Sequence, residues 1–352
     1  MKYMLVFWAL FILSTNVQGN ECPRLSRGIR VSAVGDILVH EVLFRAALKE
    51  KSRFRALWSN LTPTLKDADL TVGNLEGPVA PGVAGGGKAV ADVGLVYDGT
   101  VYSGSNFLFN YHPALLEDLV FSGFGLVTTA NNHALDRGSL GVDRTIEQLT
   151  QAHLPFIGTR AHDSKSLRGE VLSVGSYRLG VIACTEMING FSDRFDQVLK
   201  CGSPEIVGLI DNLKQRSDAV LVFPHWGNEY EPRPDAAQKS WARKWIEAGA
   251  AAVIGNHPHV LQTVEWITRS NGSRGLVIYS LGNFVAAQGA MEKKVSAVVH
   301  LDFLPSSTGL ELAQFSYLPL HRPAGSLAIT LLNRDSVELR HAREQLGPAV
   351  CQ

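Results

Sequence analysis

The sequence predicts an α/β protein in which strands and helices alternate as far as about residue 260, with β-rich additions beyond that point. Short apolar runs rich in β-branched residues, typical of buried strands, alternate with segments whose apolar residues have helical spacing. Several runs end in a glycine followed by histidine, asparagine or a carboxylate. Because ligands of open α/β sheets bind at the carboxyl ends of the strands, we expect these polar side chains to meet at one edge.

The first half of the chain is expected to contain four strands and three helical segments. Strands are expected at 29–36, 69–76, 125–130 and 154–158, and helical spacing covers 41–59, 113–122 and 140–151. The glycine-rich excursion from Pro78 to Asn106 has weak periodicity, and loops of that length are usually functional or mobile.

The second half is expected to begin with a hairpin and to end in β structure. The hairpin is expected at 171–173 and 178–183, helices near 204–216 and 235–248, and strands at 219–223, 251–254, 262–268, 275–280, 296–304, 310–318 and 325–333. The expected organisation is a signal peptide at 1–19, a main domain at 29–290 and a β-rich extension at 291–352 packed on the core.

Residues 1–19 have the pattern of a secretory signal peptide. Lys2 supplies the positive start, an apolar segment follows, and small residues precede an expected cleavage near Gly19. The alternative is a retained membrane anchor, for which an apolar run of about ten residues is short. The sequence therefore predicts export to the periplasm or the outside of the cell.

The four cysteines can pair in three ways. Cys22 and Cys351 lie near the two ends of the mature chain, which are often close together in a domain. Cys184 and Cys201 bracket a polar loop. In an oxidising compartment we expect the disulfides Cys22–Cys351 and Cys184–Cys201.

The composition, with 45% hydrophobic and 19% charged residues in a chain of 352, is that of a globular protein. The 33 basic and 33 acidic residues give no net charge. Composition therefore does not indicate a polyelectrolyte-binding surface, although it is compatible with a local charged patch. We expect no nucleic acid among the partners.

The run from Ala251 to Val260 ends in two histidines two positions apart. In an extended segment, residues i and i+2 point the same way, so His257 and His259 can face one point. A lone histidine is more often a core or surface residue. A pair after a strand, in a chain with similar clusters at other strand ends, favours metal ligation.

The other strand ends supply carboxylates, amides and further histidines, namely Asp36, Asn74, Glu76, Asn132, His133 and His225. Such nitrogen and oxygen donors suit one or two divalent ions of manganese, iron or zinc rather than a thiolate centre. Two ions about 3.5–4 Å apart can hold the attacking and leaving oxygens of a phosphoryl transfer. A nearby histidine can protonate the leaving group.

Two acidic residues near these motifs have alternative interpretations. Asp136 either lies in the metal shell or, as the sequence favours, caps the following turn. Glu229 either lines the cleft or is a solvated loop residue.

Six motifs, in this order, resemble those of the CapA family, the capsule-synthesis or poly-γ-glutamate biosynthesis proteins. They are Gly-Asp36, Gly-Asn-Leu-Glu76, Asn-Asn-His-Ala-Leu-Asp136, His-Trp-Gly227, Gly-Asn-His-Pro-His259 and Tyr-Ser-Leu-Gly-Asn-Phe284. The family belongs to the calcineurin-like metallophosphoesterase superfamily, so the resemblance implies a four-layer α/β/β/α sandwich over residues 29–290. It also implies that Asn283, in the last motif, lies near the site.

The resemblance implies roles for six residues. Asp36 matches the first acidic ligand, Asn132 the asparagine ligand, and His133 the histidine that acts on the leaving group. The later histidine ligands are matched by His225, His257 and His259.

The chain departs from the superfamily pattern at three points. Leu38 stands where a histidine ligand is usual, and His40 follows two residues later. Asn74, with Glu76 two residues on, stands where a bridging aspartate is usual, and Asn256 stands where the family more often has a second histidine. A missing ligand makes one ion an alternative to two.

The resemblance implies two classes of function. One is an exported metal-dependent hydrolase acting on a phosphoester or another bond of an anionic envelope polymer. The alternative is a non-hydrolytic component that binds an anionic polymer such as polyglutamate during capsule assembly or export, with a membrane synthase complex as a partner. Fold alone does not choose between them.

Overall fold

The computed structural model describes residues 21–166, 168–332 and 335–351. The expected signal peptide, residues 1–19, lies outside the described residues. Within them, no helix combines the length and the hydropathy needed to cross a membrane.

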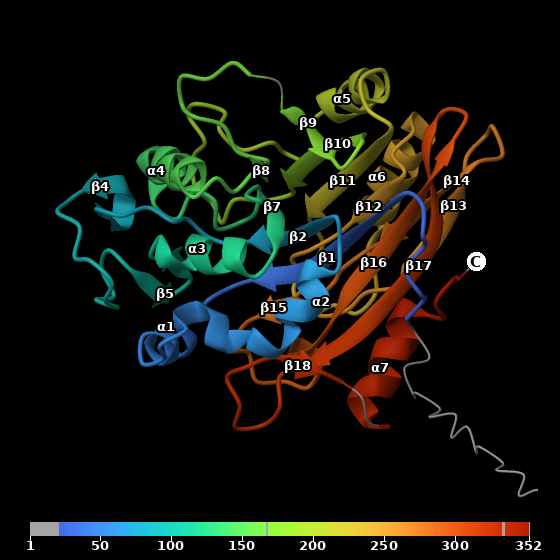
Figure 1. Ribbon diagram of the computed structural model, residues 1–352. Coiled ribbons are helices and arrows are strands. Elements are labelled where there is room, and N and C mark those ends of the chain that lie inside the picture. Colours follow the sequence, from blue (N-terminus) through green and yellow to red (C-terminus); the bar gives the residue numbers. More distant parts are fainter. Residues whose placement is uncertain (1–20, 167, 333–334, 352) are drawn as a thin grey trace, which may run out of the picture.

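Two β-sheets form the centre of the molecule (Figure 1). The first sheet contains, from edge to edge, β18 (Thr330–Leu331), β17 (Gly309–His321), β16 (Val295–Ser306), β1 (Ile29–Ile37), β2 (Leu70–Leu75), β7 (Phe124–Thr128) and β8 (Phe156–Ile157), with β15 (Asn283–Val285) beside β1. The second sheet contains β13 (Val264–Thr268), β14 (Arg274–Ile278), β12 (Ala252–Ile254), β11 (Ala219–His225), β10 (Tyr177–Thr185) and β9 (Gly169–Val174).

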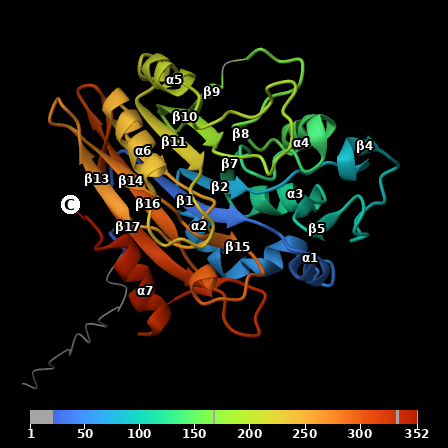
Figure 2. The same ribbon diagram turned by 180° about the vertical axis from the view of Figure 1, so that it is seen from behind.

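Helices cover the outer face of each sheet, as the opposite views in Figures 1 and 2 show. The first sheet carries α1 (Glu41–Ala47), α2 (Thr62–Lys66) and α3 (Ala114–Phe121), and the second carries α5 (Glu205–Lys214) and α6 (Ala236–Ala248). Between the sheets, apolar side chains of β1 and β11 belong to one continuous core. Strands covered on both faces are rich in apolar residues, and β1 and β11 are buried along their whole length. The four-layer α/β/β/α fold class is thus confirmed.

The remaining helix of the central region, α4 (Gly138–Gln151), lies beside β8, and its side chains reach two cores. Val142 belongs to the core between the sheets, whereas Leu149 belongs to the core outside the first sheet. The helix thus closes the end of the sandwich where β8 is the edge strand.

The β-rich tail expected from residue 291 completes the first sheet, because β16 pairs antiparallel with β1 and β17 pairs with β16. The chain then forms a helix, α7 (Val337–Leu346), that the β-rich pattern did not predict. The missed signals were a Ser336 cap, whose side chain accepts from Leu339 N, and buried residues at helical spacing, Leu339, Ala342 and Leu346.

The helix expected over 41–59 is wrong beyond Ala47. The chain instead forms a 3₁₀ turn at Arg53–Leu57, and its first residue, Arg53, has a φ of 51°. The buried Asp118 carboxylate of α3 accepts from Phe54 N at 2.9 Å and from Arg53 at 3.1 Å. This tertiary contact replaces the hydrogen bonds that would have continued the helix.

The glycine-rich excursion contains two small hairpins, β3 (Val83–Ala84) with β4 (Lys88–Ala89) and β5 (Ser103–Ser105) with β6 (Leu108–Asn110). The buried Asn110 side chain ties them together, since Oδ1 accepts from Ala80 N and Nδ2 donates to Val101 O. The excursion therefore has a defined packing, and Phe109 belongs to the outer core of the first sheet.

A bulge in β1 turns Asp36 toward the second sheet. Ala33 is opposite Val72, but Asp36 is opposite Asn74, so β1 has one residue more than β2 between these pairs. An extra residue reverses the alternation of side chains, so Ala33 and Asp36 face the same side. Gly35 permits this, since a Cβ there would lie 1.8 Å from Gly282 O.

Gly255, just beyond β12, has an equally close neighbour. Its N–H donates to Ile278 O, and a Cβ would lie 2.0 Å from Tyr279 O and 2.5 Å from Trp226 Nε1. Only glycine fits between these backbone and indole groups without a shift, so this position determines how the chain leaves β12 toward His257.

We expect Gly255→Ala to lower the free energy of unfolding by about 2 kcal/mol or more, because backbone must move to admit the methyl group. The matched control is Gly208→Ala in α5, where an added Cβ meets nothing within 4 Å. That change should raise stability by about 0.5–1 kcal/mol. Urea unfolding of both variants measures the difference, and equal effects would contradict the packing described for Gly255.

The structure contains both expected disulfides, Cys22–Cys351 and Cys184–Cys201. The first joins the two ends of the described chain. The second closes the loop that places Asn189 beside His133, 3.5 Å from its ring nitrogen Nδ1.

We expect Cys184→Ala combined with Cys201→Ala to lower the free energy of unfolding by ~3 kcal/mol, because the disulfide restricts a 17-residue loop in the unfolded chain. Urea unfolding of the oxidised protein measures the loss, and nonreducing peptide mapping of the wild type checks the pairing. An unchanged free energy of unfolding would show that the bond contributes nothing to stability.

Candidate metal centre

The strand register aligns polar residues at the carboxyl ends of both sheets. In the first sheet Asp36 is opposite Asn74 on one side and Asn283 on the other. In the second sheet His225 forms a bridge with Asn256. Because strands of each sheet run parallel here, these ends lie at the same edge, where α/β sheets bind ligands.

Five buried side chains from these ends form two overlapping groups. Asp36, Glu76 and His259 form one, and Glu76, His225 and His257 form the other, with the ligand atoms of each group within 4.8 Å of one another. All five residues are at most 2% exposed. Glu76 is common to both groups, as a carboxylate that bridges two ions would be.

Glu76 gives the strongest reason to expect a cation. Both of its carboxylate oxygens are buried without a hydrogen-bond partner among the described residues. Burial, and secondly the Asp36 carboxylate, raises the pKa of Glu76 well above its ordinary value. A buried carboxylate without a partner is costly. A divalent ion would compensate both acids, so the residues present fit a metal.

Two of the three histidines, His225 and His257, are in the neutral form that binds metals. Burial, followed by the neighbouring His257 and His259, lowers the pKa of His225 well below its ordinary value. Burial likewise lowers the pKa of His257 to about 4. The ring nitrogens His257 Nδ1 and His225 Nε2 lie 3.1 Å apart. Neutral imidazoles offer a lone pair to a metal, so no proton need be displaced at neutral pH.

The rings of His257 and His259 meet for a reason other than the expected one. Both residues have positive φ, 99° and 58°, so the segment is not an extended strand. Their ring centroids nevertheless lie 6.0 Å apart, and both histidines belong to the groups around Glu76 and Asp36. The predicted convergence is present, but left-handed backbone, rather than strand alternation, produces it.

Amide side chains orient the acidic and imidazole groups. Asn74 Nδ2 donates to Asp36 Oδ1 at 2.8 Å, and Asn283 Oδ1 lies 3.0 Å from His259 Nδ1. Asn132 Oδ1 lies 2.9 Å from His225 Nε2, so its oxygen faces the same centre.

Sequence reasoning missed two residues that support Asn74. Its Oδ1 accepts from Thr128 Oγ1 at 3.0 Å and from Asn131 Nδ2 at 3.3 Å. Thr128 is the last residue of β7, and Asn131 stands in the same motif as Asn132. Their positions at the strand end were the available signal, but only the register of β2 with β7 pairs them with Asn74.

His133 lies beside this group with its ring held by a carboxylate. His133 Nδ1 and Asp136 Oδ2 are 2.9 Å apart, and the same oxygen accepts from Phe109 N at 2.7 Å. The Phe109 ring meets the imidazole edge-on at 4.7 Å between centroids. The expected capping role of Asp136 is therefore wrong, because the carboxylate binds these two groups and α4 has no side-chain cap.

The other three candidates occupy different places around the centre. His40 Nδ1 lies 3.1 Å from Leu38 O and is in none of the groups of metal-ligating residues found in the described chain, so it does not replace the ligand missing at Leu38. Asn256 is buried, and its Oδ1 has no partner among the described residues. Glu229 is exposed, yet its carboxylate lies within 4.8 Å of His257 and His259, which places it at the mouth.

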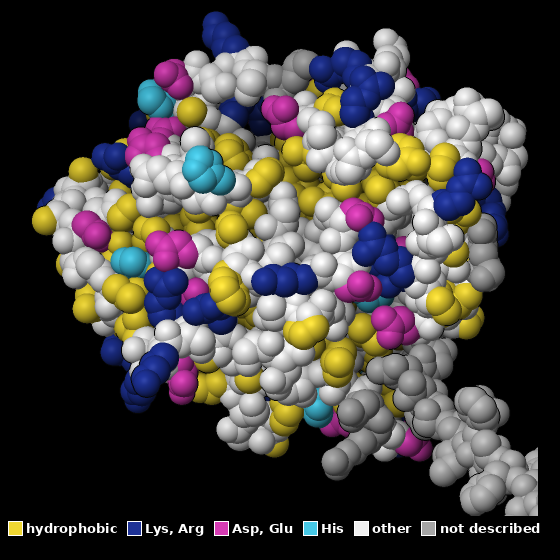
Figure 3. All heavy atoms as spheres, viewed as in Figure 1, with side chains coloured by type: hydrophobic (Ala, Val, Ile, Leu, Met, Phe, Trp, Pro, Cys, Tyr) yellow, Lys and Arg dark blue, Asp and Glu magenta, His cyan; other side chains and the backbone are white. Residues whose placement is uncertain are grey.

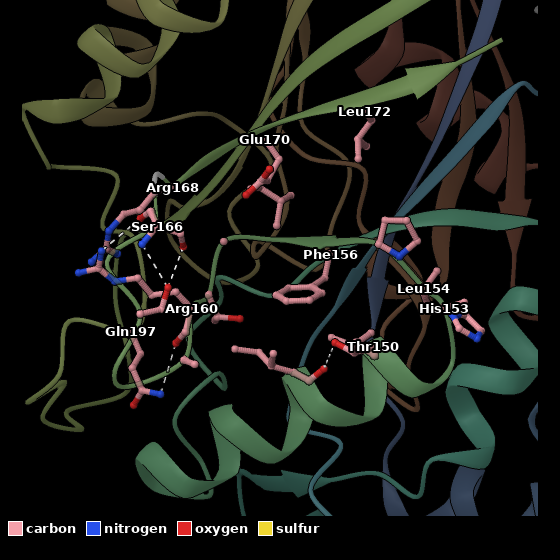
Figure 4. Close-up of a pocket in the computed structure, with 18 residues that line it drawn as sticks. Thr150, His153, Leu154, Phe156, Arg160, Ser166, Arg168, Glu170, Leu172 and Gln197 are labelled. Carbon is pink, nitrogen blue, oxygen red and sulfur yellow. Dashed lines mark hydrogen bonds between the residues drawn. The ribbon is translucent and has the colours of Figure 1, made fainter.

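A separate cavity of about 600 Å³ lies between β8 and β9, where both sheets end (Figure 4). Phe156 and Leu172 contribute to its apolar lining, and hydrophobic side chains also gather between α4 and α5 on the surface in Figure 3. Arg160 and Arg168 line it as well, but both guanidinium groups pair with Asp196. The cavity contains no residue of the metal centre.

Two curated relatives resemble the chain over most of its length. The capsule biosynthesis protein CapA of Bacillus anthracis is 28% identical over 337 residues, which cover 90% of this chain and 74% of the relative. The PGA biosynthesis protein CapA of Bacillus subtilis (strain 168) is 27% identical over 286 residues, covering 80% and 69%.

Solved structures resemble the chain more distantly. The calcineurin-like phosphoesterase YfkN from Bacillus subtilis is 13% identical, with coverage of 90% of this chain and 96% of that chain and a TM-score of 0.49. The NAD nucleotidase NadN of Haemophilus influenzae is 11% identical, covers 92% and 64%, and also has a TM-score of 0.49.

A family model described as bacterial capsule synthesis protein PGA_cap matches residues 30–288, from β1 through the whole of the metal centre. The chain therefore belongs to this family of bacterial capsule synthesis proteins.

Proposed function

We propose that the protein is an exported metal-dependent hydrolase that cleaves a phosphoester or another bond in an anionic polymer of the cell envelope. The observation that carries the proposal is the fully buried Glu76 carboxylate. It has no hydrogen-bond partner among the described residues, and it is shared by two groups of potential ligands. The order of the motifs, which resembles that of the metallophosphoesterase superfamily, supports the same chemistry.

Asp36, Glu76 and His259 would hold one divalent ion, and Glu76, His225 and His257 would hold a second, with the Asn132 oxygen facing the same centre. When bound, manganese, iron or zinc ions would polarise the scissile bond and lower the pKa of water. Asn74 and Asn283 keep Asp36 and His259 in place through the hydrogen bonds described above. The donor set does not select one metal among the three.

His133 is the residue that would deliver a proton to the leaving oxygen. Its Nδ1 is used by Asp136, which leaves Nε2 as the nitrogen available to a substrate. His133 Nδ1–H donates to Asp136 Oδ2, and this hydrogen bond fixes the tautomer and the direction of the ring. Phe109 packs on the ring edge and excludes water from that side.

The alternative is a non-hydrolytic component of capsule assembly that binds an anionic polymer. The observation that favours it is Leu38, a buried apolar residue at the position of a usual metal ligand. His40 does not compensate for it, since its ring faces Leu38 O and Ala287 N. A membrane synthase complex would be a partner in either role. The two disulfides support an exported location.

We expect the mature protein to purify with about one to two equivalents of a transition metal, because nitrogen and oxygen donors converge there. His257→Ala combined with His259→Ala should empty the site, which elemental analysis measures. The control is His162→Ala, an exposed histidine paired with Asp143 outside the centre. A double variant that keeps its full metal content would rule out these two histidines as ligands.

We expect His133→Asn to reduce turnover by at least about tenfold while metal content and thermal stability stay nearly unchanged, because proton transfer typically contributes about 10²–10⁴-fold. Turnover is measured on a panel of phosphomonoesters, phosphodiesters and γ-glutamyl peptides with Mn²⁺, Zn²⁺ or Fe²⁺. Asn132→Ala should instead weaken metal binding.

The matched control for His133→Asn is His162→Asn, which removes an imidazole from a histidine–aspartate pair on the surface. It should leave turnover unchanged. An inert panel, together with polyglutamate binding that His133→Asn hardly alters, would replace hydrolysis by the binding role.

A further inference from the structure

Three cationic side chains without an acidic partner lie beside the metal centre. Lys293 and Lys294 precede β16, and Arg322 follows β17. Among the described residues, none of the three forms a salt bridge. Like charges collected on two neighbouring, partly buried segments repel each other, and an anion bound between them would relieve this repulsion.

Backbone contacts join the cluster to the metal centre. Asn283, whose Oδ1 lies beside His259, donates from Nδ2 to Lys293 O at 2.9 Å and to Gln288 Oε1 at 3.0 Å. Arg322 Nη2 donates to Gln288 O at 2.6 Å. The same asparagine that orients a candidate ligand therefore fixes the segment that carries the cations.

Lys293 stands at the mouth of the centre. Its ammonium lies 3.1 Å from the centroid of the Tyr230 ring, and that ring is 6.1 Å from the ring of His259. The aromatic face holds the ammonium near the opening without neutralising it. An anionic substrate approaching His259 would meet this charge.

Arg322 is a half-buried guanidinium with no anion to compensate it. Burial lowers the pKa of Arg322, and no carboxylate opposes this effect. Two of its N–H groups donate to Gln288 O and Ser326 O, and its buried Nε has no partner among the described residues. The side chain is thus held in place by backbone oxygens while its charge remains unpaired.

A cavity of about 390 Å³ adjoins these side chains and is lined by Lys294, Arg322, His321 and Glu338, among others. Glu338 is the carboxylate in this lining, and its charge interacts with His321 and Arg340. Lys294 and Arg322 thus line the same cavity, and neither forms a salt bridge with this carboxylate.

We propose that Lys293, Lys294 and Arg322 form a subsite for a second anionic group of the substrate, a carboxylate or phosphate on a repeat next to the one at the metal centre. The inference rests on the proposed function only in taking the metal centre as the place where the polymer is held. Charged donors bind such groups strongly, and a guanidinium can bind both oxygens of a carboxylate or phosphate. A repeating polyanion can occupy both the metal centre and this subsite, whereas a small ester with one anionic group cannot, so the subsite favours binding of the polymer.

The test uses the full mature protein loaded with metal and two fluorescent probes of equal charge, a γ-glutamate decamer and a glycerol-phosphate oligomer. Lys294→Gln combined with Arg322→Gln should weaken binding of at least one probe by about tenfold or more, with metal content unchanged. Arg322→Lys keeps the positive charge, so it should weaken binding of the same probe much less than the double variant does. Fluorescence anisotropy gives the affinities, and the probe that responds identifies a carboxylate or a phosphate polymer.

The matched control is Lys239→Gln combined with Lys244→Gln, which removes two positive charges from exposed positions of α6 on the other sheet. It should change affinity by less than about twofold, since exposed charges far from a ligand are screened. If the Arg322 double variant fails to fold, Lys293→Gln replaces it and should weaken binding by at least about threefold.

The outcomes separate the two proposals. Loss of affinity in the double variant without any hydrolysis by the wild type would remove the hydrolase function but support the subsite. Affinity equal to that of the wild type would overturn the subsite, even in an active hydrolase. Failure of the wild type to bind either probe would also overturn it.

Discussion

Two fully buried carboxylates, Asp36 and Glu76, are the constraint on which the rest of the structure depends. Asp36 has a hydrogen-bond donor in Asn74, whereas Glu76 has none among the described residues. Two adjacent acids in a buried site repel each other, and neither is solvated. Neutral histidines surround them and supply lone pairs rather than positive charge. Cations bound between these acids would offset the repulsion, which would link stability to metal binding.

The sandwich brings these groups together because the carboxyl ends of two parallel sets of strands face each other. Each sheet contributes one half of the donor set, Asp36 and Glu76 from the first and the three histidines from the second. Two glycines allow the final approach. Gly35 accommodates the bulge that turns Asp36 inward, and Gly255 lets the chain pass Tyr279 O before the histidines. Backbone geometry thus determines the site as much as the ligands do.

The two sides of the metal centre are lined by different kinds of residues. On one side Asp136 and Phe109 hold His133, where a proton could be delivered. On the other, Asn283 connects His259 to the segment that carries Lys293. Under the proposed function, a polymer held on the second side would present its scissile bond to the first side. The absence of net charge does not conflict with that proposal, because a local cationic patch would be sufficient to hold a polyanion.

The sequence by itself determined the α/β class, the strand-end motifs and the family resemblance, because alternation, spacing and strand ends are local properties. It favoured the two disulfide pairs that the structure contains, but it left three pairings possible. It could not determine the direction of Asp36, since a one-residue bulge reverses the side-chain alternation without leaving a periodic signal. It also gave the wrong reason for the convergence of His257 and His259, whose positive φ is fixed by the surrounding fold. The support of Asn74 by Thr128, and the approach of Arg322 to Asn283 through Gln288, join residues far apart in the chain. Only tertiary structure decides such contacts, because they depend on strand register and on which segments pack side by side.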